Sequence, residues 1–109
     1  MIKQILAAAG IPAKQSRYLN PPGSTYAVYF DDTDTLDGPD PTPGAPLLVS
    51  HSATVELYEA IPDDASEAAM EEAITAQGLH WTKQARYWLQ NVQRYQVIYE
   101  FEFTETRRA

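Results

Sequence analysis

Apolar and polar residues alternate most regularly between residues 95 and 103, close to the C-terminal end of the chain. Every second side chain there is aromatic or aliphatic, and the apolar set consists of Tyr95, Val97, Tyr99, Phe101 and Phe103. A period of two over this length predicts a β-strand with one buried face and one mostly wetted face. A strand this rich in aromatics needs a sheet to join, and nothing in it resembles catalytic machinery. It therefore favours a structural or interaction protein.

Three further segments carry strand patterns. Residues 25–30 are rich in β-branched and aromatic side chains. Residues 47–59 alternate in two parts, and residues 52–53 between them are candidates for a bulge or a change of exposure. Residues 80–89 alternate more weakly and predict a strand, with a turn over residues 90–94 before the final strand.

Two segments have the spacing of an amphipathic helix. Residues 1–9 form the first helix, and Gly10 is suited to end it. Residues 64–77 form the second helix, in which Asp64 and Glu67 have the spacing of a capping box. The buried stripe expected on this helix is Ala69, Met70, Ala73 and Ile74. The acids expected to face water are Glu67, Glu71 and Glu72.

Two stretches between these elements predict loops. Residues 13–24 are polar and end in the sequence Asn-Pro-Pro-Gly-Ser. Residues 31–46 hold five aspartates, four prolines and two glycines, so they predict neither a helix nor a central strand. A loop of this length in a compact domain is either disordered or ordered by a partner.

These elements predict a single α+β domain over residues 1–109. We expect a mostly antiparallel four-stranded sheet with two helices packed on one face. The order along the chain is helix, strand, strand, helix, strand, strand.

The net charge of −7 is unevenly distributed along the chain. Residues 1–30 hold three basic and no acidic residues, and residues 31–72 hold twelve acidic residues and no lysine or arginine. The acidic total argues against non-specific nucleic-acid binding, which needs clustered cations. Two interpretations of the segregation stay open. Either the acids keep the surface soluble, or copies of the protein meet with opposite charges in register.

Candidate catalytic chemistry is sparse. The chain has no cysteine, which excludes disulfides, thiolate metal sites and cysteine nucleophiles. His51 stands between two serines, but neighbours along a strand point to opposite faces, so adjacency does not make a dyad. We therefore predict no catalytic residue and no cofactor. No apolar run approaches the length of a membrane span, and residues 5–9 are too short for a signal-peptide core.

The candidate metal ligands are Asp32, Asp34 and Asp37. Calcium loops place three acids at alternate positions and supply a bidentate glutamate further on. Here an extra residue precedes the third acid, and residues 39–46 contain no glutamate. The pattern favours a solvated acidic loop, and we predict no metal site.

Several segments along the chain together carry a family resemblance. A short N-terminal helix ends in Gly10, Ile11 and Pro12, and a pair of prolines precedes the strand at 26–29. The Asp/Gly/Pro loop, the segment 52–58, a Glu-rich helix and the ending at 87–101 follow. In this order the segments resemble tail terminator and tail completion (head–tail joining) proteins of tailed phages and prophages. The resemblance covers nearly the whole chain, and the very Asp/Pro-rich loop departs from the commoner pattern.

The resemblance implies an α+β virion protein that assembles as a ring, typically a hexamer, in the bacterial host cytoplasm. Its partners would be other copies of itself, the tail tube and the head connector, and no catalytic residue comes with it. Two alternatives stay open: another head–tail connector or minor capsid protein, and a small enzyme or metal-binding domain. The residues expected at the ring interface are Asp31, Asp32, Asp34, Asp37, Asp40, Arg94, Glu100, Glu102, Arg107 and Arg108.

Overall fold

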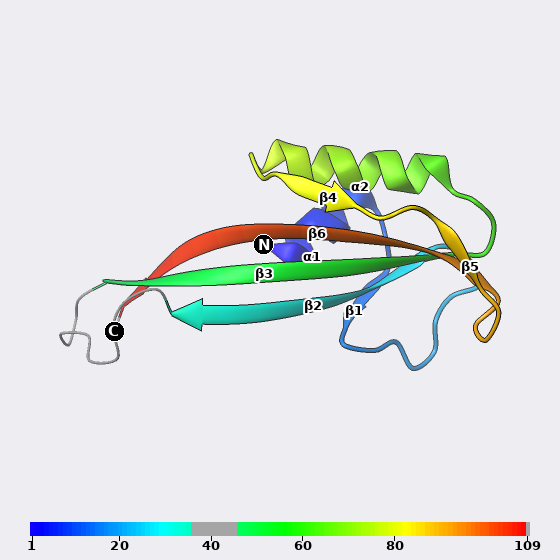
Figure 1. The fold of residues 1–109 in the computed structure, drawn as a ribbon, viewed down its shortest axis with the longest axis horizontal. Helices are drawn as coiled ribbons and strands as arrows, with labels where there is room; N and C mark the ends of the chain where they lie inside the picture. Colours follow the sequence, from blue (N-terminus) through cyan, green and yellow to red (C-terminus); the bar gives the residue numbers. More distant parts are fainter. Residues whose placement is uncertain (36–45, 109) are drawn as a thin grey trace.

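A computed structural model describes residues 1–35 and 46–108 as an α+β arrangement of two helices and one sheet. Figure 1 shows the helices lying along part of a long, twisted sheet. The elements in chain order are α1 (Ile2–Ala9), β1 (Ala13–Gln15), β2 (Tyr26–Thr35), β3 (Pro46–Glu59), α2 (Asp64–Ala76), β4 (Trp81–Lys83), β5 (Tyr87–Leu89) and β6 (Arg94–Arg108). The predicted fold class is confirmed.

The sheet is larger and more mixed than the predicted four-stranded one. It has six strands in the order β1-β2-β3-β6-β4, with β5 also paired to β6. β1 runs parallel to β2, and the other pairs are antiparallel. The sequence pattern missed β1 because three residues are too few to show a period. The predicted strand at 80–89 is divided into β4 and β5, which pair with different parts of β6.

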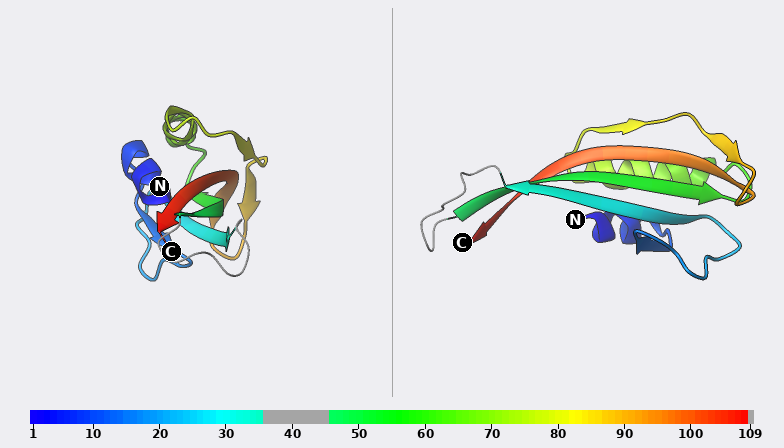
Figure 2. Two further views of the ribbon diagram at one scale, coloured as in Figure 1. Left: turned by 90° about the vertical axis from the view of Figure 1, so that its left-hand side faces the viewer. Right: turned by 60° about the horizontal axis from the view of Figure 1, so that its bottom comes forward.

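The core lies between the helices and one face of the sheet, here called the inner face. Alternate residues of β3 and β6 point into it, and Val55, Leu57, Val97 and Tyr99 are completely buried. The apolar stripes of α1 and α2 pack against this face, so both helices cover the same side of the sheet (Figure 2). The predicted buried face of β6 is confirmed, and the opposite, outer face carries the exposed Glu100 and Glu102.

The helix ends agree with the sequence in one case and correct it in the other. Gly10 ends α1 at φ 72°, in the left-handed region that glycine adopts without a Cβ penalty. α2 is capped by Asp63, whose side chain accepts a hydrogen bond from the Ser66 N–H, so the prediction of Asp64 as the cap was wrong. Glu67 is therefore not part of a capping box. It is buried, so its predicted exposure to water was wrong.

The predicted loop at 31–46 is shorter at both ends. Residues 31–35 continue β2 and pair with β3, and Pro46 begins β3. Aspartates are tolerated there because their side chains reach water, and proline is tolerated as the first residue of a strand. The pairing of β3 with both neighbours is continuous through residues 52–53, so no bulge interrupts it.

Three strands extend past the helices and form an arm, which we define as residues 31–35 of β2, 46–52 of β3 and 102–108 of β6. Figures 1 and 2 show these strands continuing beyond α1 and α2. The molecule is elongated, with extents of 51 × 27 × 21 Å along its principal axes. β6 runs five residues past the predicted end at residue 103 because it stays paired with β3 as far as Pro46.

Candidate functional site

The arm has an acidic outer face. Asp32 and Asp34 of β2 point to this face and are exposed, as is Glu102 of β6. Leu48 of β3 also lies on the outer face and is 43% exposed. The arm therefore presents acids together with one apolar residue.

The arm also has open strand edges in the part of the chain that the structure describes. β1 pairs with β2 only over residues 27–29, so residues 30–35 of β2 have a strand neighbour on one side only. On the other side of the arm, β4 pairs with β6 only as far as Phe101. Open edges expose backbone N–H and C=O groups that can pair with another chain.

His51 joins the three strands at the root of the arm, on the inner face. Its Nδ1 lies 2.8 Å from Asp31 Oδ1 on β2, and its Nε2 lies 2.6 Å from Glu105 Oε1 on β6. The ring stacks on Phe103, which is its partner across the β3–β6 pair, with centroids 4.4 Å apart. We call Asp31, His51 and Glu105 the histidine clamp.

The clamp favours the doubly protonated form of His51. Ionised carboxylates only accept hydrogen bonds, so contacts at both ring nitrogens require a proton on each of them. Burial of the ring opposes its charge, but the hydrogen bonds to Asp31 and Glu105 outweigh burial and raise the pKa of His51 above 6.5. The clamp is thus a cation held between two anions on neighbouring strands.

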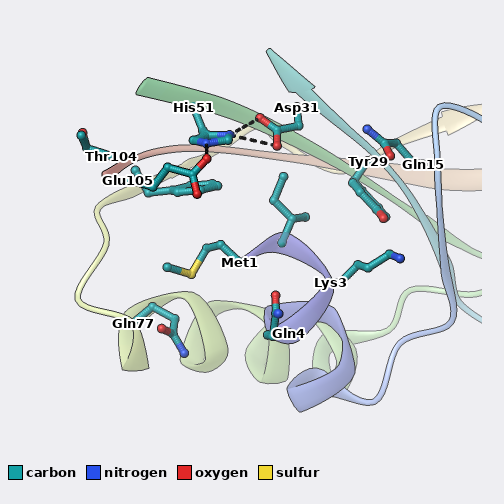
Figure 3. A pocket seen from close by; sticks show the side chains of 12 residues that line it. Met1, Lys3, Gln4, Gln15, Tyr29, Asp31, His51, Gln77, Thr104 and Glu105 are labelled. Carbon is teal, nitrogen blue, oxygen red and sulfur yellow. Dashed lines mark hydrogen bonds and ion pairs between the residues drawn. The ribbon is translucent and has the colours of Figure 1, made fainter. Parts of the chain in front are cut away.

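A hollow of about 640 Å³ lies beside the clamp, between the inner face of the sheet and the helices. Figure 3 shows His51, Asp31 and Glu105 on one side of it and Met1, Lys3 and Gln77 on the other. Both nitrogens of His51 are engaged by carboxylates, and Ser52 is exposed on the outer face. This arrangement provides a positioned ion pair but no nucleophile next to a free base.

A second charge cluster, which includes the buried Glu59 and Glu67, joins the segment between β4 and β5 to α2. The Arg86 guanidinium contacts Glu67 at 2.6 Å, Asp64 at 2.5 Å and Glu59 at 3.2 Å. Lys83 contacts Glu67 at 2.9 Å and Glu71 at 2.8 Å. These contacts divide β4 from β5, because the chain must leave the sheet edge to bring Arg86 over the start of α2.

Glu59 is the most deeply buried acid in this cluster. Its side chain is completely buried, and no described donor gives a hydrogen bond to Oε2. Burial and a hydrogen bond with Glu67 raise the pKa of Glu59 to about 7. Burial also disfavours the charge of Glu67, but Lys83, Glu59 and Arg86 outweigh it and lower the pKa of Glu67. Glu59 therefore carries the proton of this pair and Glu67 the charge.

A third feature lies on the edge of the sheet formed by β1 and the segment that follows it. Lys14, Arg17, Tyr18, Leu19 and Asn20 line a hollow of about 470 Å³, which we call the basic hollow. Leu19 is 73% exposed there. Lys14 is level with Val28 in the pairing of β1 with β2, which places it on the outer face.

The structure separates the predicted interface residues. Asp31 belongs to the histidine clamp, and Asp32 and Asp34 lie exposed on the arm. Glu100 and Glu102 lie exposed on the outer face of β6. Arg94 begins β6 at the opposite end from the arm, and its Nη1 donates to the Gln93 carbonyl. The backbone of Arg107 and Arg108 forms the end of β6. The other two predicted interface residues, Asp37 and Asp40, lie outside the described residues.

Of the candidate metal ligands, Asp32 and Asp34 are described, and Asp37 is not. Within residues 1–35 and 46–108, no three His, Asp or Glu side chains converge in a way that would hold a metal ion. The clamp itself does not form such a group because its two carboxylates lie on opposite sides of the imidazole.

Neither of the two charge clusters could be predicted from the sequence. The position of His51 on the inner face follows from the alternation of β3, but its partners come from strands 20 and 54 residues away in sequence. Glu59 and Glu67 are acids at apolar positions of their elements, and such a mismatch is the one signal that points to them. Arg86 lies in the segment 80–89, where the alternation is weak.

Neither helix in the described part of the chain has the length and apolar character needed to cross a bilayer. No protein-family model matches the sequence, and no curated protein is significantly similar to it.

Proposed function

We propose that this chain is a virion assembly protein of the tail terminator or tail completion type. It would form a ring at the head-proximal end of the tail and join the tail to the head. The observation that supports the proposal most is the arm, three paired strands that project past the helices with an acidic outer face and open edges. More than half of the arm side chains that the structure describes are exposed, as expected of a segment that contacts a neighbour.

The geometry suits a ring because rings need two different patches on each subunit. A head-to-tail interface joins one patch to the other and closes if the rotation between subunits permits. The arm and the basic hollow are two such patches, opposite in charge and separate on the surface. The histidine clamp supports this use of the arm, since it ties the three strands together where they leave the helices.

Other head–tail connectors and minor capsid proteins could use the same arm, so the proposal rests on the sequence resemblance for the position in the virion. The alternative of a small enzyme is less well supported. The clamp is the most enzyme-like group in the described residues, and both nitrogens of its histidine are already engaged by carboxylates.

The proposal is tested by sedimentation velocity of the chain alone and with isolated tail tubes of the phage or prophage that encodes it. We expect association that depends on concentration, or rings that form at the tube ends. Leu48→Ser on the arm should weaken both. Ile61→Ser is the matched control, because Ile61 is 74% exposed and lies far from the arm, between β3 and α2. A chain that stays monomeric and does not bind tubes would refute the proposal.

A further inference from the structure

Two exposed cations take no part in the ion pairs of the described residues. Lys83 and Arg86 are engaged with acids of α2 and with Glu59. Within the described residues, the side chains of Lys14 and Arg17 form no ion pair, and both residues are exposed. Two cations line one hollow, the basic hollow, with no acid among its lining residues.

Two acids on the β2 strand of the arm also lie outside the ion pairs of the described residues. Asp32 and Asp34 are exposed on the outer face and take part in no ion pair within the described residues. Asp31, which precedes Asp32 on β2, forms an ion pair with His51 instead. Among the described residues, the β2 strand of the arm therefore offers two carboxylates outside any ion pair, with the exposed Leu48 on the same face of the neighbouring strand.

Within the described residues of one subunit, no ion pair joins the two patches. Lys14 is level with Val28 of β2, while Asp32 and Asp34 lie four and six residues further along the same strand. At about 3.3 Å per residue this separates them by about 13 and 20 Å along a rigid sheet. The longer distance is more than the side chains of Lys14 and Asp34 can span, so contact between these two residues requires a second molecule.

We propose that the arm of one copy of this chain docks on the basic hollow of the next copy. Asp32 and Asp34 would meet Lys14 and Arg17, and Leu48 would contact Leu19, which is also exposed. The occupant of the hollow is thus a second copy of this chain. This inference rests on the proposed function, because it identifies the two patches by which the ring is built.

The contact is head-to-tail, so each subunit keeps one free arm and one free hollow until the assembly closes. Much of the attraction comes from exposed charges. The association is therefore expected to weaken with salt, since the Debye length falls from about 10 Å at 0.1 M to about 3 Å at 1 M.

The test uses two full-length variants, each lacking the charges of one patch. The arm variant is Asp32→Asn with Asp34→Asn, and the hollow variant is Lys14→Gln with Arg17→Gln. Each should weaken self-association at low salt by at least about tenfold, since two exposed pairs contribute together about 1.4 kcal/mol. Glu72→Gln and Lys3→Gln remove exposed charges of each sign from the helices and should leave the association unchanged.

A mixture of the two variants tests the head-to-tail arrangement. The arm variant keeps an intact hollow and the hollow variant keeps an intact arm, so equal amounts should form one-to-one pairs that grow no further. Sedimentation velocity measures this for the free chain, and the same comparison is made by tube binding if the wild type associates only on tail tubes. If the wild type forms rings and both variants assemble equally well, the proposed docking is wrong and the proposed function is unaffected. A wild type that neither associates nor binds tubes overturns both.

Discussion

His51 Nε2 lies 2.6 Å from Glu105 Oε1, and this contact joins two residues 54 positions apart in sequence. It connects β3 to β6 at the place where both strands leave the helices. With Asp31 on the other nitrogen, the imidazole spans three strands. The root of the arm is therefore held by a charge-assisted contact beside the edge of the apolar core, against which Phe103 packs.

Replacing His51 by glutamine should destabilise the fold by about 1–3 kcal/mol, because it removes the cation that lies between two carboxylates. The effect should depend on pH. The pKa of His51 is raised in the folded state, so the clamp contributes its full stability below pH 6.5. That contribution is lost as pH rises through the folded pKa. Urea unfolding of wild type and His51→Gln from pH 5 to about 9 measures the difference. A difference that stays constant over this range would contradict a protonated clamp.

Glu59→Gln should have a pH dependence with its own window. Burial raises the pKa of Glu59 to about 7 from an ordinary 4.5, so the folded chain keeps a proton that the unfolded chain has already released. Wild-type stability should fall from this cause between pH 4.5 and about 7, and glutamine removes that loss. The variant should therefore gain stability relative to wild type as pH rises through this window. Parallel unfolding curves would show that Glu59 is not protonated in the fold.

Arg86→Met should be among the most damaging substitutions of a charged residue in the chain. The guanidinium contacts the buried Glu59 and Glu67, and removing one partner of a buried ion pair typically costs about 3–5 kcal/mol. Partial exposure of Arg86 places the expected loss at the lower end of that range. Arg17→Met is the matched control, since Arg17 is exposed and forms no ion pair within the described residues. Thermal and urea unfolding of the two variants give the comparison, and equal losses would contradict this assignment.

Asp63→Ala and Asp64→Ala should differ, although the residues are adjacent. Asp63 accepts hydrogen bonds from the Ser66 N–H and from the Thr25 hydroxyl, so its loss should cost about 1–2 kcal/mol. Asp64 is almost fully exposed and contacts only Arg86, so its loss should cost less than about 1 kcal/mol. The free energies of unfolding of the two variants decide between them. A larger loss at Asp64 would restore it as the cap.

The fold could be predicted from the sequence wherever periodicity extends over several turns or residue pairs. The strand at 95–103 and the helix ending at Gly10 are both confirmed. Local signals failed where the tertiary partner decides the outcome. Residues 31–35 have loop composition but form a strand because β3 pairs with them along their whole length.

The candidate site was predictable only in part. Asp32 and Asp34 could be named as candidate interface residues from the sequence; the structure shows that both are exposed on the arm, and their place in an interface stays a prediction. Lys14 and Arg17, to which we propose that these aspartates dock, were visible in the sequence only as two of the three basic residues in the acid-free segment 1–30. The clamp of Asp31, His51 and Glu105 depends on the register of three strands, which a single sequence does not specify.

The central claim is that the arm builds a ring on the end of a tail. It is tested most directly by electron microscopy of isolated tail tubes mixed with the wild-type chain or with the arm variant, Asp32→Asn with Asp34→Asn. The account predicts closed rings of the wild type at tube ends and few or none with the arm variant. Bare tube ends with the wild type, under conditions where the chain is folded, would contradict it.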